Sequence, residues 1–358
     1  MEQYNLSAEY QLGASMVLGA GYVGSQGHRL LATYDANPGN PALCLSPQLA
    51  SQGCGPYGED STYVSASGGT IYGTRPAGVF SNNGLSAANG GLEAFSSMFT
   101  INSIANSSYN SAQFRLERRA SDFQFLASYT FSKSLDNSSG FQNLLNPFCF
   151  KCDRNLSAFD ARHRFVFSYT YELPLKRFVP GGGVRQKLLD GWEIGGIYAY
   201  QSGVPVHLTD TSSDNSLTGG YDFEPADRPD VVGPIQTQDP HKSGCAFGTG
   251  AGTGSPCAPV PNQFFNPNAF AFEPLGQFGN ARHNMFPGPP VNNWDFTVIK
   301  RTAFKERYSV EFRTEFFNIL NHTQFYNPDG DIGAGPQFGV ISAARDPRFI
   351  QFAAKLAF

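Results

Sequence analysis

Apolar and polar residues alternate along much of the chain. The clearest example lies near residues 163–173, where Phe165, Phe167 and Tyr169 alternate with Ser168. Successive side chains of a β-strand point to opposite faces of its sheet, so this period of two predicts strands with one apolar and one polar face. The pattern predicts nine strands, near residues 2–11, 14–24, 109–119, 122–133, 163–173, 191–202, 292–302, 307–318 and 347–358.

The predicted strands are long. A tilted strand needs about 9–11 residues to cross the hydrocarbon layer, whereas strands of soluble proteins average about 5–6. Tyr and Trp residues stand near the strand ends, as in the aromatic girdles of membrane barrels. A soluble sandwich with its apolar faces turned inward is the alternative. We favour an all-β fold, a transmembrane antiparallel β-barrel whose polar side chains face a wet lumen.

The links between the predicted strands are sorted by length. The long links, 25–108, 134–162, 203–291 and 319–346, all fall on one side of the sheet, and the shorter ones fall on the other. Outer-membrane barrels have short periplasmic turns and long extracellular loops. The sorting therefore predicts a protein of the cell outer membrane with its long loops outside.

The strand count is odd. Bacterial single-chain barrels have an even number of strands, so we expect a strand before Met1 or an unrecognised one within 25–108. Residues 99–104 are the best candidate inside that link, although such a strand would break the sorting of the loops. The first residues also lack the basic and apolar run of a secretory signal. We therefore interpret residues 1–358 as the C-terminal part of a larger barrel, with about nine or ten of its strands.

The chain ends on an amphipathic strand with a terminal aromatic residue. This pattern is typical of the closing strand of an outer-membrane barrel, which the barrel-assembly machinery reads during insertion. The residues of this predicted signal are Ile350, Phe352, Ala354, Leu356 and Phe358.

Composition excludes two other classes. The 358 residues are 41% hydrophobic and 15% charged, with a mean hydropathy of −0.29. An apolar run of about 18 residues, which a transmembrane helix needs, does not occur in the sequence. The net charge of −4 offers no basic surface for nucleic acid.

Six cysteines form three pairs that are close in sequence. All of them lie in the three longest links, where an oxidising exterior allows disulfides to restrain long loops. A zinc or redox role for the Cys-Phe-Lys-Cys motif is the alternative, but a zinc site needs further ligands that this sequence does not supply nearby. We predict local disulfides, while pairing across the pairs stays open: Cys44 with Cys54, Cys149 with Cys152, and Cys245 with Cys257.

Other chemical signals are weak. The six histidines are scattered, and residues 329–331 (Asp-Gly-Asp) lack the spacing of a calcium loop and are ordinary turn formers. A Gly-x-Ser-x-Gly elbow or a phosphate-binding loop is absent from the sequence. We predict no enzyme activity, no cofactor and no metal site.

Several motifs together resemble one family. They are residues 21–27 (GYVGSQG), 129–134 (YTFSKS), 159–165 (FDARHRF), 293–296 (NWDF) and 312–322 (FRTEFFNILNH). Spread from the first hairpin to the last, they resemble the barrel region of the TonB-dependent, Oar-like outer-membrane receptors. The resemblance implies a complete protein with a plug inside a barrel of about 22 strands. It further implies energised uptake of a bulky ligand such as a glycan, peptide or chelate, with TonB acting through a plug that these residues do not contain.

Charged side chains on the polar strand faces would meet the plug or the ligand. Any wet lumen needs such residues, so they do not identify a ligand site, and we name no ligand-binding residue. The long loops around Cys44–Cys54 and Cys245–Cys257 are better candidates for ligand contact. Expected partners are outer-membrane lipid, the assembly machinery, the plug and TonB, and the alternative is a passive porin or adhesin-like barrel. The predicted lumen residues are Arg164, Glu172, Glu193, Asp295, Glu311, Arg313 and Glu315.

Overall fold

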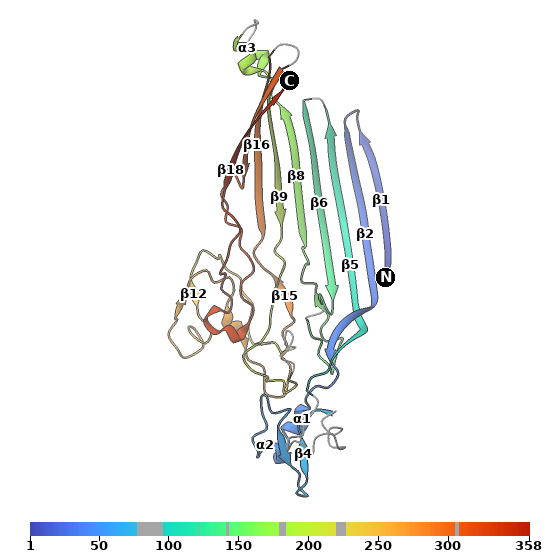
Figure 1. Ribbon diagram of the computed structural model, residues 1–358, viewed down its shortest axis with the longest axis vertical. Coiled ribbons are helices and arrows are strands. Elements are labelled where there is room, and N and C mark those ends of the chain that lie inside the picture. The colour runs from blue at the N-terminus through green and yellow to red at the C-terminus, as the bar shows by residue number, and fades with distance from the viewer. Residues whose placement is uncertain (77–95, 121, 141–142, 179–183, 220–226, 305–307) are drawn as a thin grey trace.

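Long antiparallel strands form one curved sheet (Figure 1). The computed structural model describes residues 1–76, 96–120, 122–140, 143–178, 184–219, 227–304 and 308–358. Neighbouring strands follow the chain order, as the all-β prediction requires, and the short β7 (Asn155–Leu156) adds to β6. The sheet runs through β1 (Glu2–Leu12), β2 (Met16–Asp35), β5 (Phe99–Arg119), β6 (Phe123–Asp136), β8 (His163–Glu172), β9 (Trp192–Gln201), β16 (Val291–Phe304), β17 (Tyr308–Phe317) and β18 (Phe349–Ala357).

The second and third strands are longer than predicted. β2 continues to Asp35 and β5 begins at Phe99, so the link between them spans 36–98 rather than 25–108. Residues 99–104 are therefore the first part of β5, and the prediction of a separate strand there is wrong. An irregularity in the pairing between Gly27 and Leu31 interrupts the alternation of β2, which hid its second half in the sequence.

The strand register separates an apolar face from a polar face. One row of neighbours across six strands is apolar: Leu18, Leu116, Ala127, Phe167, Tyr198 and Trp294. A row on the opposite face is mostly polar: Gln124, Thr170, Gly195, Thr297, Glu315 and Gln351. Large side chains of the apolar face are exposed, such as Leu6 at 76% and Phe352 at 67%. A face this apolar and this wide is expected to lie against lipid or another apolar surface.

The long links lie together at one end of the sheet. The β1–β2 turn, η2 (Leu175–Phe178), α3 (Val184–Leu189) and the C-terminus lie at the other end (Figure 1). The long links therefore share one end of the sheet, while their placement outside the cell stays a prediction. We call the described parts of 36–98, 137–162, 202–290 and 318–348 the loop layer.

The loop layer contains short elements of its own. The 36–98 link forms α1 (Pro41–Cys44), α2 (Pro47–Ala50) and the hairpin of β3 (Thr62–Val64) and β4 (Thr70–Tyr72). The helices begin at Asn40 and Ser46, whose side chains accept hydrogen bonds from the first turns. The later links form β10 (Pro205–His207), β11 (Asp230–Val231), β12 (Gly244–Cys245), β13 (Pro259–Val260), η3 (Pro267–Ala269), β14 (Phe270–Ala271), β15 (Asn284–Pro287) and η4 (Ile332–Gln337).

The largest hydrophobic core lies in the loop layer. The ring of Phe265 lies 5.1 Å from that of Phe338 and 5.6 Å from that of Phe270, measured between centroids. Val206 and Leu208 complete the fully buried centre of this cluster, which joins the 202–290 and 318–348 links. The loop layer is therefore a packed body held at the ends of the strands.

Two buried arginines tie separate links together. Arg75 forms ion pairs with Asp35 at 3.2 Å and Asp60 at 2.6 Å, and its guanidinium also donates to the carbonyls of Thr218 and Gly219. In the same way, Arg228 binds Asp153 at 2.8 Å. These contacts attach the 36–98 and 137–162 links to the 202–290 link.

Among the described residues, no helix is both long enough and apolar enough to span a membrane.

Candidate functional site

An ion network crosses three strands on the polar face. Arg301 of β16 lies opposite Glu311 of β17 in the register, and their side chains pair at 2.9 Å. Arg301 also binds Glu193 of β9, and Arg313 binds Glu311 at 2.9 Å and Glu315 at 3.7 Å. The structure therefore brings four of the predicted lumen residues into one network. Its central residue, Arg301, was missed in the sequence, although the alternation of β16 places it on the polar face.

The network borders a groove of about 730 Å³ on the polar side of the sheet. Charged residues of β5 reach the same groove, where Glu117 binds Arg115 and Arg119. Exposed ion pairs contribute only about 0–1 kcal/mol each to stability. These ion pairs place positive and negative side chains next to one another along a hydrated surface. Such a surface can bind a polar partner. We call this surface the lumen groove.

The other three predicted lumen residues lie in separate places. Asp295 accepts hydrogen bonds from Asn293 and from the backbone of Asn318, each at 2.9 Å, so it fixes the turn after β17 as well as bordering the lumen groove. Glu172 lies opposite Glu193 in the register, at the end of β8 away from the loop layer. Arg164 borders a smaller cavity of about 290 Å³ near the loop layer.

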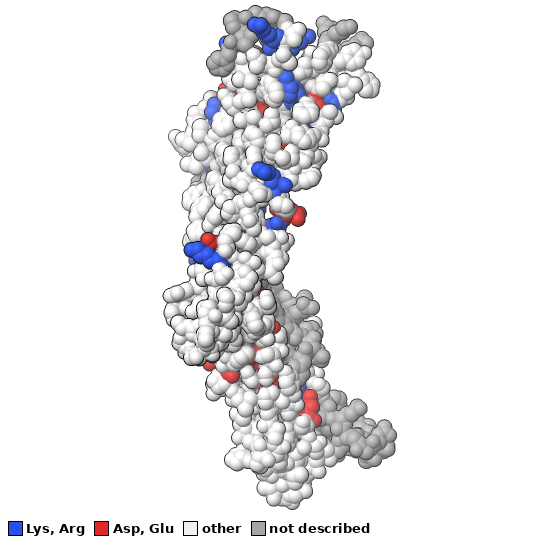
Figure 2. Space-filling view, turned by 90° about the vertical axis from the view of Figure 1, so that its left-hand side faces the viewer, with Lys and Arg blue, Asp and Glu red and all other residues white. Residues whose placement is uncertain are grey.

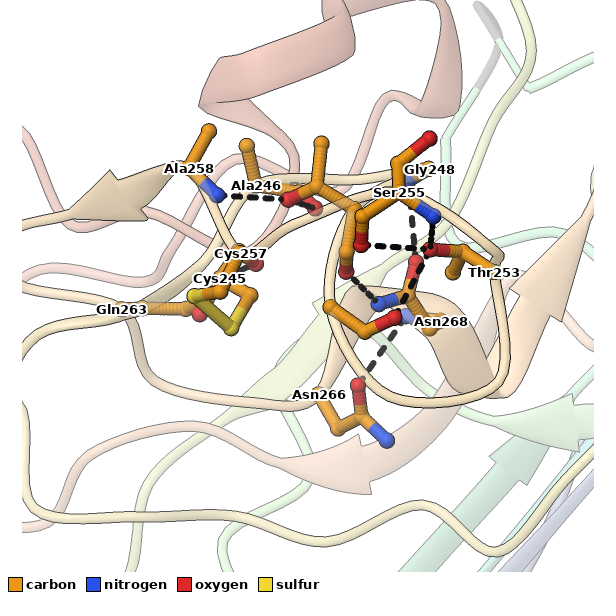
Figure 3. Close-up of a disulfide and its surroundings, with 12 residues drawn as sticks. Cys245, Ala246, Gly248, Thr253, Ser255, Cys257, Ala258, Gln263, Asn266 and Asn268 are labelled. Carbon is orange, nitrogen blue, oxygen red and sulfur yellow. Dashed lines mark hydrogen bonds between the residues drawn. A yellow bond between two sulfur atoms is a disulfide. The ribbon is translucent and has the colours of Figure 1, made fainter.

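Each predicted cysteine pair forms a disulfide within the loop layer. These are Cys44–Cys54, Cys149–Cys152 and Cys245–Cys257. The loop closed by the last of them is shown in Figure 3, where Asn268 holds it through Gly248 at 2.9 Å and the carbonyl of Thr249 at 2.7 Å. Gln263 donates to the carbonyl of Cys245 at 2.9 Å from the other side. The disulfide loop is therefore anchored on the packed part of the loop layer.

The Asp-Gly-Asp sequence at 329–331 forms a structural turn. Asp331 caps η4 by accepting from Gly333 at 2.9 Å, and it accepts from the backbone of Thr211 at 3.0 Å. It therefore connects the 318–348 link with the 202–290 link. Within the described part of the chain, no three His, Cys, Asp or Glu side chains are arranged to hold a metal ion.

Comparison with known families agrees with this architecture. The model of the outer membrane beta barrel domain family matches residues 1–351. The chain belongs to this family. Membership places the protein in the cell outer membrane, with the apolar face of the sheet against lipid and the polar face toward the lumen. Among proteins with curated functions, none shows significant sequence similarity to this chain.

The chain is also similar in fold to parts of larger solved structures. One is the outer membrane transporter YddB from Escherichia coli, with 9% identity and a TM-score of 0.42. Another is FpvA from P. aeruginosa bound to heterologous pyoverdines, with 11% identity and a TM-score of 0.34. Each match covers 99% of this chain and 32% of the solved one. The chain thus spans about a third of the length of these proteins.

Proposed function

We propose that this chain is the later part of the barrel of a TonB-dependent outer-membrane receptor, which imports a bulky ligand such as a glycan, peptide or chelate. The observation that carries the proposal is the open sheet. In the described structure β1 pairs only with β2 and β18 only with β17, so each leaves an edge of backbone groups unpaired. Unpaired sheet edges are not tolerated in lipid. We therefore infer that further strands complete the barrel, in agreement with a barrel wider than nine strands.

Two further features support a transporter. A wide barrel has a water-filled lumen that must be gated if it is not to leak, and a plug is the usual solution in large transporters. The lumen groove offers paired charges of both signs to such a plug. The loop layer, with its own core and disulfides, provides a firm outer surface for ligand capture. The motifs that resemble the Oar-like receptors agree with this assignment.

Channel activity separates the proposal from its main alternative. The native protein, purified from outer membranes with an antibody against the Cys245–Cys257 loop, is placed in a planar lipid bilayer. A plugged receptor gives no constitutive conductance and migrates well above 38.8 kDa, the mass of this chain. Constant open conductance would contradict the proposal and favour a passive porin. A band at 38.8 kDa would favour a porin or an adhesin-like barrel.

The end of the chain provides a test of barrel assembly. Phe358 follows the last residue of β18 and is 92% exposed. Deleting Phe358 is expected to lower the amount of assembled barrel, because the terminal aromatic belongs to the segment that the assembly machinery reads. Heat-modifiable migration of outer-membrane extracts on a gel measures the assembled fraction. The control Phe358→Tyr retains an aromatic terminus and should assemble normally; unchanged migration after the deletion would contradict the prediction.

A further inference from the structure

Four acidic side chains are buried together in the loop layer. They are Asp210, Asp214, Asp227 and Glu273, and none is more than 4% exposed. Three of them come from the irregular stretch after β10 and before β11, and Glu273 follows β14. Acidic residues are almost never fully buried without partners. The group therefore needs an explanation in its hydrogen bonds.

Only part of this acidic cluster is satisfied. One oxygen of Asp210 accepts from the backbone of Ser212 at 2.9 Å, and one oxygen of Asp214 accepts from the backbone of Thr218 at 3.0 Å. The second oxygen of each aspartate and both carboxyl oxygens of Glu273 are buried without a hydrogen-bond donor in the described structure. Burial raises the pKa of Asp210, and a hydrogen bond from the side chain of Glu273 is among the smaller influences that lower it. One oxygen of Asp210 and both oxygens of Glu273 therefore lie in the same buried group, where no donor among the described residues reaches them.

Two charged groups from outside the cluster that act on it are also acidic. Asp230 acts on Glu273 from β11, and Asp331 acts on Asp210 from the N-terminus of η4. The neighbouring cation, Arg228, directs its guanidinium to Asp153 at 2.8 Å. Figure 2 shows the same imbalance on the surface, where the charged residues visible at the level of the loop layer are mostly acidic. Burial, with the neighbouring carboxylates of the cluster, raises the pKa of Asp227 to about 7 and that of Glu273 to about 8.

We propose that the Asp210–Glu273 pair shares a proton and that, together with Asp227, it makes the stability of the loop layer depend on pH. The loop layer is stable when the pair is protonated and opens more readily when the proton is lost. A protonated carboxyl supplies the O–H donor that the geometry lacks, because it can donate to the facing carboxylate. Two buried carboxylates at short range cannot both ionise cheaply. Loss of the proton leaves negative charges on the 202–219 stretch, on Glu273 and on Asp331. Packing holds these segments together, so the like charges repel one another at short range.

The sign of the pH dependence follows from the raised pKa values. An unfolded Glu ionises near pH 4.3, whereas Glu273 holds its proton to about pH 8 in the folded protein. Between these values the folded loop layer binds more protons than the unfolded one, so its stability falls as pH rises. The stabilising effect of protonation is complete below the unfolded pKa. It is lost as pH passes through the folded values of about 7 for Asp227 and about 8 for Glu273.

Hydrogen exchange of the full-length native protein, in detergent with EDTA, tests this inference. Protection factors of peptides covering 208–219 and 270–281, corrected for intrinsic exchange, are expected to fall roughly tenfold or more between about pH 6 and pH 8.5. In Glu273→Gln the fall in protection should be clearly smaller, because the amide donates a hydrogen bond and does not ionise, which leaves Asp227 as the group that titrates. Asp210→Asn should act in the same way and gives a second, independent variant.

The control is Asp239→Asn, which removes an acid of the same loop layer whose side chain is 50% exposed and paired with His241. It should leave the pH dependence unchanged. Protection that does not vary with pH in the native protein, or that falls equally in Glu273→Gln, would overturn the inference. A second arm adds CaCl₂ at about pH 8.5. Protection restored by calcium in the native protein but not in Glu273→Gln would also overturn it, because the cluster would then hold a cation in place of the proton.

Discussion

Replacing Arg75 with alanine is expected to detach the 36–98 link from the rest of the loop layer. The side chain is 1% exposed, and it pairs with Asp35, Glu59 and Asp60 while donating to three backbone carbonyls. Removing one partner of a buried ion pair costs about 3–5 kcal/mol, because the remaining charges stay buried without compensation. Asp35 stands at the end of β2, so the loss acts where the strand meets the loop layer.

Limited proteolysis of intact outer membranes measures this effect. Cleavage within 36–76 should become much faster in Arg75→Ala, while the strands stay resistant and the protein remains heat-modifiable. Arg119→Ala is the matched control, since its side chain is 79% exposed and binds only Glu117 among the described residues. Equal cleavage rates in the two variants would contradict the role that we assign to Arg75.

Introducing arginine on the lipid-facing side of the sheet is expected to have the second largest effect. Ala127 of β6 lies between Leu116 and Phe167 on the apolar face. An arginine facing the middle of the bilayer costs about 2–4 kcal/mol in outer-membrane barrels. Ala127→Arg should therefore lower the free energy of unfolding of the full-length protein in phospholipid vesicles by that amount, as measured by urea titration.

Ser168→Arg is the matched control for this experiment. Ser168 is also a small residue in the middle of a strand, but it borders the lumen groove, where Glu117 and water are available to a cation. We expect little change in its urea midpoint. Equal destabilisation by both substitutions would contradict the assignment of one lipid-facing and one hydrated face to the sheet.

The regular part of the fold could be predicted because lipid and water lie on opposite sides of each strand. For β8 the predicted range of 163–173 differs from the observed one by a single residue. Prediction failed where the pairing is irregular, as in β2 beyond Gly27. The packing of Phe265 against Phe338 could not be predicted, because the two residues come from different links and neither link has a periodic pattern.

The same limit applies to the candidate sites. Alternation was enough to place Glu193, Glu311 and Arg313 on the lumen side, and it contained the signal for Arg301 as well. The burial of Asp227 and Glu273 had no such signal. Both lie in stretches rich in Asp, Pro and Gly, which are typical of exposed turns, and only the packing of several links removes them from water.

Sidedness in the outer membrane tests the central claim most directly. An epitope tag is inserted between Ser67 and Gly68, at the open tip of the β3–β4 hairpin. In a second version it is inserted between Gly13 and Ala14, in the β1–β2 turn at the opposite end of the sheet (Figure 1). Antibody binding to intact source cells should detect the first tag at once, and the second only after the outer membrane is permeabilised. Detection of both tags on intact cells, or of the second alone, would contradict a sheet that crosses the outer membrane with its loop layer outside.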